Sequence, residues 1–264
     1  MKALGRVVLL FGALALAGAT GCSNKEKETQ KANDPVTIHK EAGDKLLTAG
    51  EFSKAAQEYG QALQVDPKQE KLWEKKAFAH QQAGELDQYD EAFVKMLEFK
   101  PEVSQKAEML RGLAGMYMQK QALDKAEKFF GEAVKLEPND ALSLSWIGEI
   151  YSRRGGARDP KAEAVPEHLD KALSYYDKVI AIKPEDPVPY VNKRVIMNKY
   201  MTHERKAKEA DEELLKKVKD KAKVEEIKAS AEKHQARMDE LKKQSDEISA
   251  KVAELQKKNP PVKK

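Results

Sequence analysis

The sequence predicts an all-α protein, with about four stacked helix pairs and a capping helix followed by a long charged C-terminal helix. Charged residues make up 35% of the chain, and Ala, Leu, Glu and Lys are abundant, a composition typical of helical proteins. Prolines end similar segments at Pro67, Pro101, Pro138 and Pro184. The first interval is 34 residues, and we interpret the next two, 37 and 46 residues, as the same unit with three and twelve residues added.

Residues 1–21 are predicted to be an export signal. Lys2 and Arg6 precede an apolar run from Val7 to Ala19, which is shorter than the roughly 20 residues that a membrane-spanning helix needs. The run ends in Ala-Thr-Gly-Cys22, which resembles the lipobox of bacterial lipoproteins. This resemblance implies cleavage before Cys22 and lipidation of its sulfur and new amine. The alternative is an ordinary secretory signal in which Cys22 is incidental.

Residues 22–34 are predicted to be the lipidated cysteine and a flexible tether with a reach of roughly 20 Å. Cys22 is the only cysteine, so the chain forms no internal disulfide, and lipidation explains a lone thiol in an exported protein. Loss of Lys2 and Arg6 lowers the formal net charge from +4 to +2, and charges of both signs are interspersed. The composition therefore gives no indication of nucleic-acid binding.

The first helix pair, residues 36–69, places small and large side chains in a fixed order. Gly43 and Ala55 are small, which lets two antiparallel backbones approach, while Leu46 and Tyr59 fill the space beside them. Gly50 supplies the turn between the helices, where glycine tolerates positive φ. The full order is Ala42, Gly43, Leu46, Gly50, Ala55, Tyr59, Ala62 and Pro67.

Residues 70–103, 107–140 and 141–186 repeat this order, and residues 187–202 begin a further unit that lacks the small position, as expected of a capping helix. The order resembles that of tetratricopeptide (TPR) repeats over residues 35–202. The resemblance implies a right-handed α-solenoid whose first helices line a concave face that binds peptides or helices of other proteins. In the fourth repeat, residues 155–166 are an insertion, either a partner contact or a tolerated loop.

Residues 203–258 contain no Gly or Pro and are predicted to form one long charged helix, before a tail at 259–264. A heptad-like seam runs through Val224, Ile227, Ala231, His234, Met238, Leu241, Ser245, Ile248, Val252 and Leu255. Its phase shifts near residues 218–224, as a stutter would cause. Four interpretations remain open: a cap on the repeats, a homodimer interface, a contact with another helix, or a solvated coiled-coil-like helix.

No catalytic, metal or cofactor site is predicted. The histidines lack metal-ligand spacing, and His39 and His80 fall at packing positions of the repeats. The sequence also lacks a nucleophile elbow and phosphate-binding glycine loops. Surface carboxylates are explained by solvated helix faces with lysine partners.

The repeat register predicts which side chains face the partner-binding groove. They are Lys40, Asp44, Leu47, Lys71, Glu74, Phe78, Gln81, Arg111, Met118, Glu149 and Asn198. TPR domains that clamp a terminal carboxylate use an asparagine where this chain has Asp44, so that specificity is not expected here. Phe78 and Met118 are candidates for anchoring an apolar side chain of a partner, and the alternative for each is a contact with a neighbouring repeat.

The combined prediction is a non-catalytic scaffold, lipid-anchored in the bacterial envelope, that serves assembly or export. Ser23 lacks the aspartate that retains lipoproteins in the inner membrane of enteric bacteria, which favours the periplasmic face of the outer membrane. The architecture is similar to TPR lipoproteins of β-barrel assembly, pilus secretin assembly and exopolysaccharide export. The alternative is a spacer or oligomerisation protein that works through its C-terminal helix.

Overall fold

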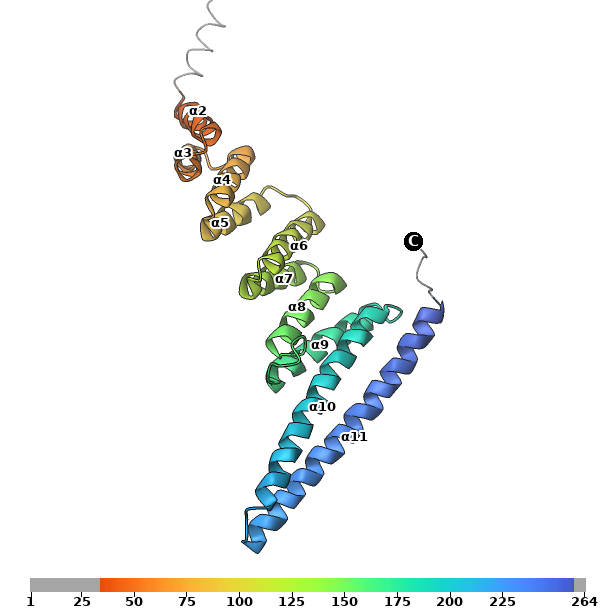
Figure 1. Ribbon diagram of the computed structural model, residues 1–264. Coiled ribbons are helices and arrows are strands. Elements are labelled where there is room, and N and C mark those ends of the chain that lie inside the picture. Colours follow the sequence, from red (N-terminus) through yellow and green to blue (C-terminus); the bar gives the residue numbers. More distant parts are fainter. Residues whose placement is uncertain (1–33, 259–264) are drawn as a thin grey trace, which may run out of the picture. The chain divides into compact units, whose positions relative to one another are not determined.

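The computed structural model describes residues 34–258, and this part of the chain is helical throughout apart from short turns and loops (Figure 1). The helices are α2 (Pro35–Thr48), α3 (Phe52–Val65), α4 (Glu70–Ala83), α5 (Leu86–Leu97), α6 (Val103–Gln119), α7 (Leu123–Leu136), α8 (Ala141–Arg154), α9 (Pro166–Ile182), α10 (Pro187–Leu215) and α11 (Lys221–Lys258). The predicted all-α solenoid with a long charged C-terminal helix is confirmed. The predicted signal, Cys22, nearly all of the tether and the tail lie outside the described residues. Within residues 34–258 no helix is long and apolar enough to cross a membrane.

The chain divides into two compact units, one ending at Lys100 and the other beginning at Pro101. In the first unit α2 packs on α3, α3 on α4, and α4 on α5. In the second unit the same neighbour-to-neighbour packing runs from α6 to α11. Each unit thus holds two helix pairs, and the second unit also carries α10 and α11.

A tyrosine ring lies on a glycine in the first and fourth helix pairs. A Cβ added to Gly43 of α2 would lie 2.6 Å from Tyr59 Cε1, and one added to Gly148 of α8 would lie 2.9 Å from Tyr176 Cε1. Both tyrosines are fully buried. The glycines are therefore required because an aromatic ring occupies the place of their side chain.

The turns inside the helix pairs use left-handed backbone. Gly50 and Gly84 follow α2 and α4 with φ of 77° and 75°. In the third pair Gln121 holds the same place with φ 58°, a conformation that is uncommon for a residue with a Cβ. The turn geometry is thus kept where the glycine is lost.

The insertion of the fourth repeat is folded against α10. Lys199 of α10, only 8% exposed, donates from Nζ to the carbonyl oxygens of Asp159, at 2.9 Å, and Ala162. Ala157 and Ala164 pack on the apolar cluster formed by α9, α10 and α11. These contacts explain the loop as part of the fold.

The predicted single helix over residues 203–258 is wrong. The capping helix continues to Leu215 as α10, residues 216–220 form a turn, and α11 begins at Lys221. The side chain of Asp220 accepts a hydrogen bond from the backbone of Lys223 at 3.0 Å, which caps the new helix. The phase shift near residues 218–224 marks this turn, so the stutter interpretation is also wrong.

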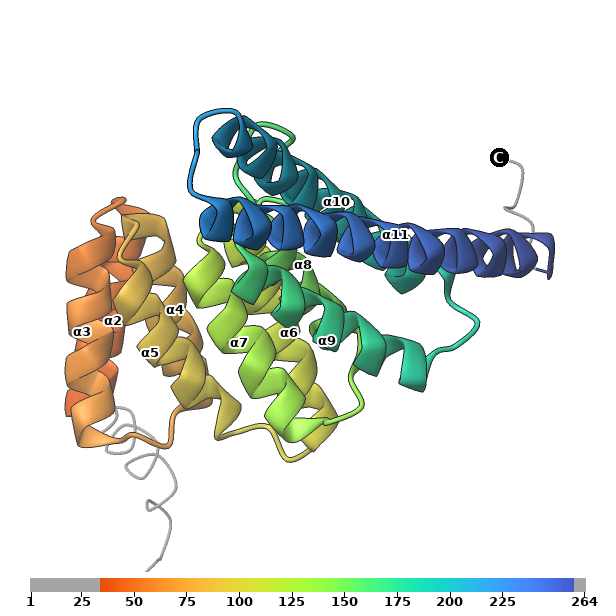
Figure 2. The same ribbon diagram turned by 90° about the horizontal axis from the view of Figure 1, so that it is seen from below.

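Helix α11 lies antiparallel along α10, and the two form a hairpin (Figures 1 and 2). Contacts run along its length: Arg194 with Ser249 at 3.2 Å, and His234 with Glu204 at 2.6 Å. All ten seam residues are buried or half-buried, and Leu241 joins the cluster around Tyr176. The seam is therefore occupied within the chain as a cap on the last repeat, which leaves the predicted homodimer without its proposed interface.

Gly43→Ala is expected to lower the free energy of unfolding by about 1–3 kcal/mol, because the new methyl group meets the buried ring of Tyr59. Gly112→Ala is the matched control, since nothing lies within 4 Å of its added Cβ and alanine favours the helix. Denaturant unfolding of both variants measures the difference. Equal stability of the two variants would contradict the packing assignment.

Candidate functional site

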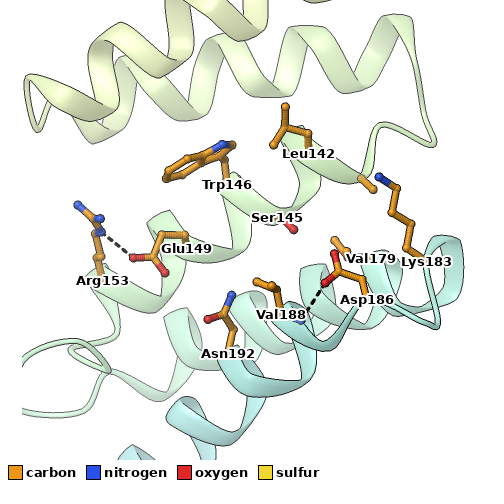
Figure 3. Close-up of a pocket in the computed structure, with 11 residues that line it drawn as sticks. Leu142, Ser145, Trp146, Glu149, Arg153, Val179, Lys183, Asp186, Val188 and Asn192 are labelled. Atoms are coloured by element: carbon orange, nitrogen blue, oxygen red, sulfur yellow. Dashed lines mark hydrogen bonds and ion pairs between the residues drawn. The ribbon is translucent and has the colours of Figure 1, made fainter. Parts of the chain in front are cut away.

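The second unit has an open groove between α8 and α10 (Figure 3). It encloses about 450 Å³ and lies on the side formed by the first helices of the pairs. Its lining comes from α8, the end of α9 and the start of α10: Ala141, Leu142, Ser145, Trp146, Glu149, Arg153, Val179, Lys183, Asp186, Val188 and Asn192.

Exposed apolar side chains flank the groove from both helices. Leu142 and Trp146 of α8 are 54% and 37% exposed, and Val188 of α10 is 56% exposed. The Trp146 ring stacks on Phe130 of α7, with ring centres 6.1 Å apart and planes 7° from parallel. The tryptophan is thus held in place by the fold while one side of it stays open to solvent.

Charged groups lie at both ends of the groove, Glu149 and Arg153 at one and Lys183 and Asp186 at the other (Figure 3). Glu149 accepts hydrogen bonds from Arg153 at 2.9 Å and from Arg158 at 2.5 Å. Arg158 also donates to Asn192 at 2.9 Å, so the insertion loop reaches the groove's polar end. Apolar walls and a fixed polar end are the arrangement by which a binding site gains both affinity and orientation.

In the first and fourth pairs an acidic residue, Asp44 or Glu149, follows the small position and lies near the tyrosine of the second helix. Tyr59 donates to Asp44 at 2.7 Å, and Lys75 donates to the same oxygen at 2.5 Å. Partial burial opposes ionisation of Asp44, but these hydrogen bonds outweigh it and lower its pKa. In the fourth pair, burial and the neighbouring carboxylate of Glu149 raise the pKa of Tyr176.

The second and third pairs have no such acid. Phe93 and Phe130 stand in the tyrosine positions, and Phe78 and Gly115 stand where the other pairs have Asp44 and Glu149. A phenylalanine ring has no hydroxyl to donate. Asp44 therefore serves Tyr59 inside the first pair, which explains this acid without reference to a ligand.

These observations decide the family. The family profile described as tetratricopeptide repeat matches residues 107–140, which are α6 and α7. A TPR repeats protein of Bacteroides fragilis has the same fold, with TM-score 0.52 at 13% identity over 85% of this chain and 97% of the other. Residues 107–140 thus match a tetratricopeptide repeat, and the described helices have the fold of a TPR solenoid. Such repeats are protein-interaction scaffolds, the class of function that the repeats predicted.

Two further proteins are similar to this chain: one matches it over a shorter stretch, and the other has a lower TM-score. The photosystem I assembly protein Ycf3 of Prochlorococcus marinus is 26% identical over 119 residues, which cover 44% of this chain and 69% of that protein. MamA of Desulfovibrio magneticus is 13% identical over 86% of this chain and 98% of the other, with TM-score 0.40.

The predicted groove residues of this TPR chain differ in what they contact. Six are exposed on the first helices: Lys40, Lys71, Glu74, Phe78, Gln81 and Asn198. Four are half-buried: Asp44, Leu47, Arg111 and Glu149. Of all eleven, only Glu149 lines the groove between α8 and α10. The prediction for Met118 as a ligand anchor is wrong, because this side chain is 7% exposed and packs in the core.

Sequence reasoning missed Leu142, Trp146 and Val188. Their signal is weak but present: Leu142 and Trp146 lie about one turn apart on α8, outside the core positions Leu144 and Ile147. Apolar residues outside the core stripe of a helix indicate a second contact surface.

No metal site is found in the part of the chain that the structure describes, where no three His, Cys, Asp or Glu side chains are arranged to hold an ion. The histidines at 39, 80 and 234 each bind one glutamate through Nδ1, at 2.6 to 2.7 Å. His80 is buried and His39 half-buried, in agreement with packing roles.

Arg111 is committed to the fold by two carboxylates. It binds Glu137 at 2.8 Å and Asp140 at 3.0 Å, and Asp140 caps α8 through the backbone of Leu142 and Ser143. Burial by itself would raise the pKa of Asp140, but hydrogen bonds from Ser143 and Arg111 outweigh it and lower the pKa.

Asp140→Asn is therefore expected to cost about 1 kcal/mol of stability at neutral pH, because the amide still caps α8 but loses the charge-assisted bonds. A lowered folded-state pKa stabilises the fold above the usual aspartate value of 3.8, and this contribution is lost as pH falls through the folded value. The gap between wild type and variant, measured by urea unfolding, should close in acid. The exposed Asp246→Asn is the control; a gap for Asp140→Asn that stays as wide in strong acid as at neutral pH would contradict this account.

Proposed function

We propose that this chain is a lipid-anchored scaffold of the bacterial envelope that binds a short amphipathic segment of other proteins between α8 and α10. The observation that carries the proposal is the groove itself, where Leu142, Trp146 and Val188 expose apolar surface around a cavity of about 450 Å³. Exposed apolar surface that is gathered in a groove is costly to leave uncovered, which favours a binding role.

The lining indicates the chemistry of the bound segment. One or two apolar side chains fill the space beside Trp146 and Val188. Charged groups of the segment pair with Arg153 at one end and with Lys183 or Asp186 at the other, all of which line the groove. A helix or extended peptide with apolar residues on one side and charges of both signs on the other fits this pattern.

The membrane anchor is the second part of the proposal. Cys22 follows an apolar signal and carries the lipid, and the hydrophilic tether lets the repeats stand away from the headgroups. Ser23 after the cysteine favours the periplasmic face of the outer membrane. A relative that is named as an assembly protein supports a role in assembling envelope components.

A photo-crosslinking amino acid at Val188 tests the groove directly in cells. We expect it to form an adduct with one or a few envelope proteins, whereas the same amino acid at Val165, exposed on the insertion loop outside the groove, forms none. Leu142→Glu should reduce the adduct at Val188 at least about tenfold, since a buried unpaired charge costs several kcal/mol. Leu136→Glu, on the second helix α7, is the control. Adducts of equal yield at Val188 and Val165 would overturn the groove assignment.

Cys22→Ala tests the anchor separately. Without the thiol no diacylglycerol is attached, so the chain is expected to lose metabolic labelling with a radioactive fatty acid. Wild type should carry the label and fractionate with membranes through detergent-sensitive attachment. Label retained by the Ala variant, or absent from wild type, would contradict lipidation at Cys22.

A further inference from the structure

Positive charge is segregated at the end of the α10–α11 hairpin. Residues 216–223 contain five lysines and one aspartate. The flanking arms have the opposite balance, with three basic and five acidic residues at 203–215 and five basic and seven acidic residues at 224–247. We call residues 214–223 the hairpin tip. The net positive charge therefore belongs to the tip, because each flanking arm has a net negative charge.

The lysine side chains of the tip are exposed to solvent. They are exposed without exception: Lys216, Lys217, Lys219, Lys221 and Lys223. Among the described residues, Lys216 is the only one of the five with an ion pair, to Glu213 at 2.5 Å. Asp220 uses its carboxylate to cap α11, where the backbone of Lys223 donates to it. Most of the positive charge is thus left for an outside partner.

An apolar side chain accompanies these charges. Leu214 is 46% exposed, and Val218 in the turn is half-buried. The seam does not need Leu214, since the buried seam residues of α11 begin at Ala231. An exposed leucine among lysines is the combination by which a protein surface attaches to the headgroup region of an anionic bilayer.

The shape of the tip decides between a lipid surface and an acidic peptide. The tip is the convex end of a two-helix hairpin, far along α10 from α9 (Figure 1). Three grooves of the described residues, lined by α2, by α7 to α9 and by α8 to α10, do not include it. A specific peptide needs a concave site, whereas a lipid surface needs only charge and a short apolar insertion.

We propose that the hairpin tip binds anionic phospholipid headgroups, as a membrane contact separate from the lipid at Cys22. Lysine side chains bind the phosphates, and Leu214 inserts between headgroups. This contact does not depend on the groove between α8 and α10, and it acts on whichever membrane the protein faces.

The test uses the full chain with Cys22→Ala, so that no thioether lipid is present. Binding is measured by sedimentation with phosphatidylcholine vesicles that contain or lack phosphatidylglycerol. The tip variant carries Lys217→Gln, Lys219→Gln, Lys221→Gln and Lys223→Gln. The control variant carries Lys233→Gln, Lys242→Gln, Lys243→Gln and Lys257→Gln, exposed positions along α11 with the same change in net charge. Glutamine keeps helix propensity close to that of lysine, so both variants keep their helices.

We expect the tip variant to lose at least about tenfold in binding to the anionic vesicles, and the control variant much less, because each lysine at a membrane surface contributes appreciably. All variants share the same apolar N-terminal run, so a difference in vesicle binding between them comes from the substituted lysines. A fluorophore on Leu214→Cys should shift to the blue with anionic vesicles only. Equal losses in the two variants, no loss in either, or an unchanged fluorophore would overturn the proposal. Crosslinking at Val188 is unaffected by these variants, so the proposed groove function stands or falls independently.

Discussion

Each described helix has an apolar side that a neighbouring helix covers in the fold. This constraint builds the two units pair by pair, because a repeat that buries its apolar side only against the next repeat cannot stop without a terminal cap. At the last pair the uncovered side belongs to α10. Helix α11 covers it, with Leu241 reaching the cluster that contains Tyr176 and Ile196. The hairpin is thus the physical end of the stack.

The same constraint explains why some polar residues on the first helices bind other helices of the fold. Asp44 is bound by Tyr59 and Lys75, and Arg111 is bound by Glu137 and Asp140. These side chains join successive helices and set the spacing of the stack. The exposed apolar side chains Leu142, Trp146 and Val188 gather in the groove between α8 and α10, and this is where the interaction function of the repeats is best supported.

The repeat register was predictable from sequence because close packing allows few alternatives. A buried ring such as Tyr59 leaves room for nothing but glycine at position 43, so the spacing of small and large residues records the helix pairs directly. The turn at 216–220 was not predictable in the same way. The stretch Lys216 to Asp220 contains no Gly or Pro, and the chain reverses there because α11 gains burial along α10. Only the phase shift of the seam pointed to it.

The binding residues were harder to predict than the fold, since exposure depends on which neighbour covers a position. Met118 and Phe78 both lie on first helices, yet Met118 is buried and Phe78 is 47% exposed. Val188 lines a groove because the insertion loop, held by Lys199, fixes the arrangement of α8, α9 and α10. Such tertiary effects are not encoded in the spacing of a single repeat.

The central claim is that α11 closes the stack within its own chain, and a mixed-isotope crosslinking experiment tests it most directly. Chains with Cys22→Ala, Arg194→Cys and Ser249→Cys are prepared with light and with heavy nitrogen, mixed in equal amounts, and treated with a short bismaleimide. Arg194 and Ser249 are in contact across the hairpin, at 3.2 Å. The account predicts crosslinked peptide pairs that are entirely light or entirely heavy. Pairs that join a light peptide to a heavy one in the proportion expected of random partners would show that the seam joins two chains, and would contradict it.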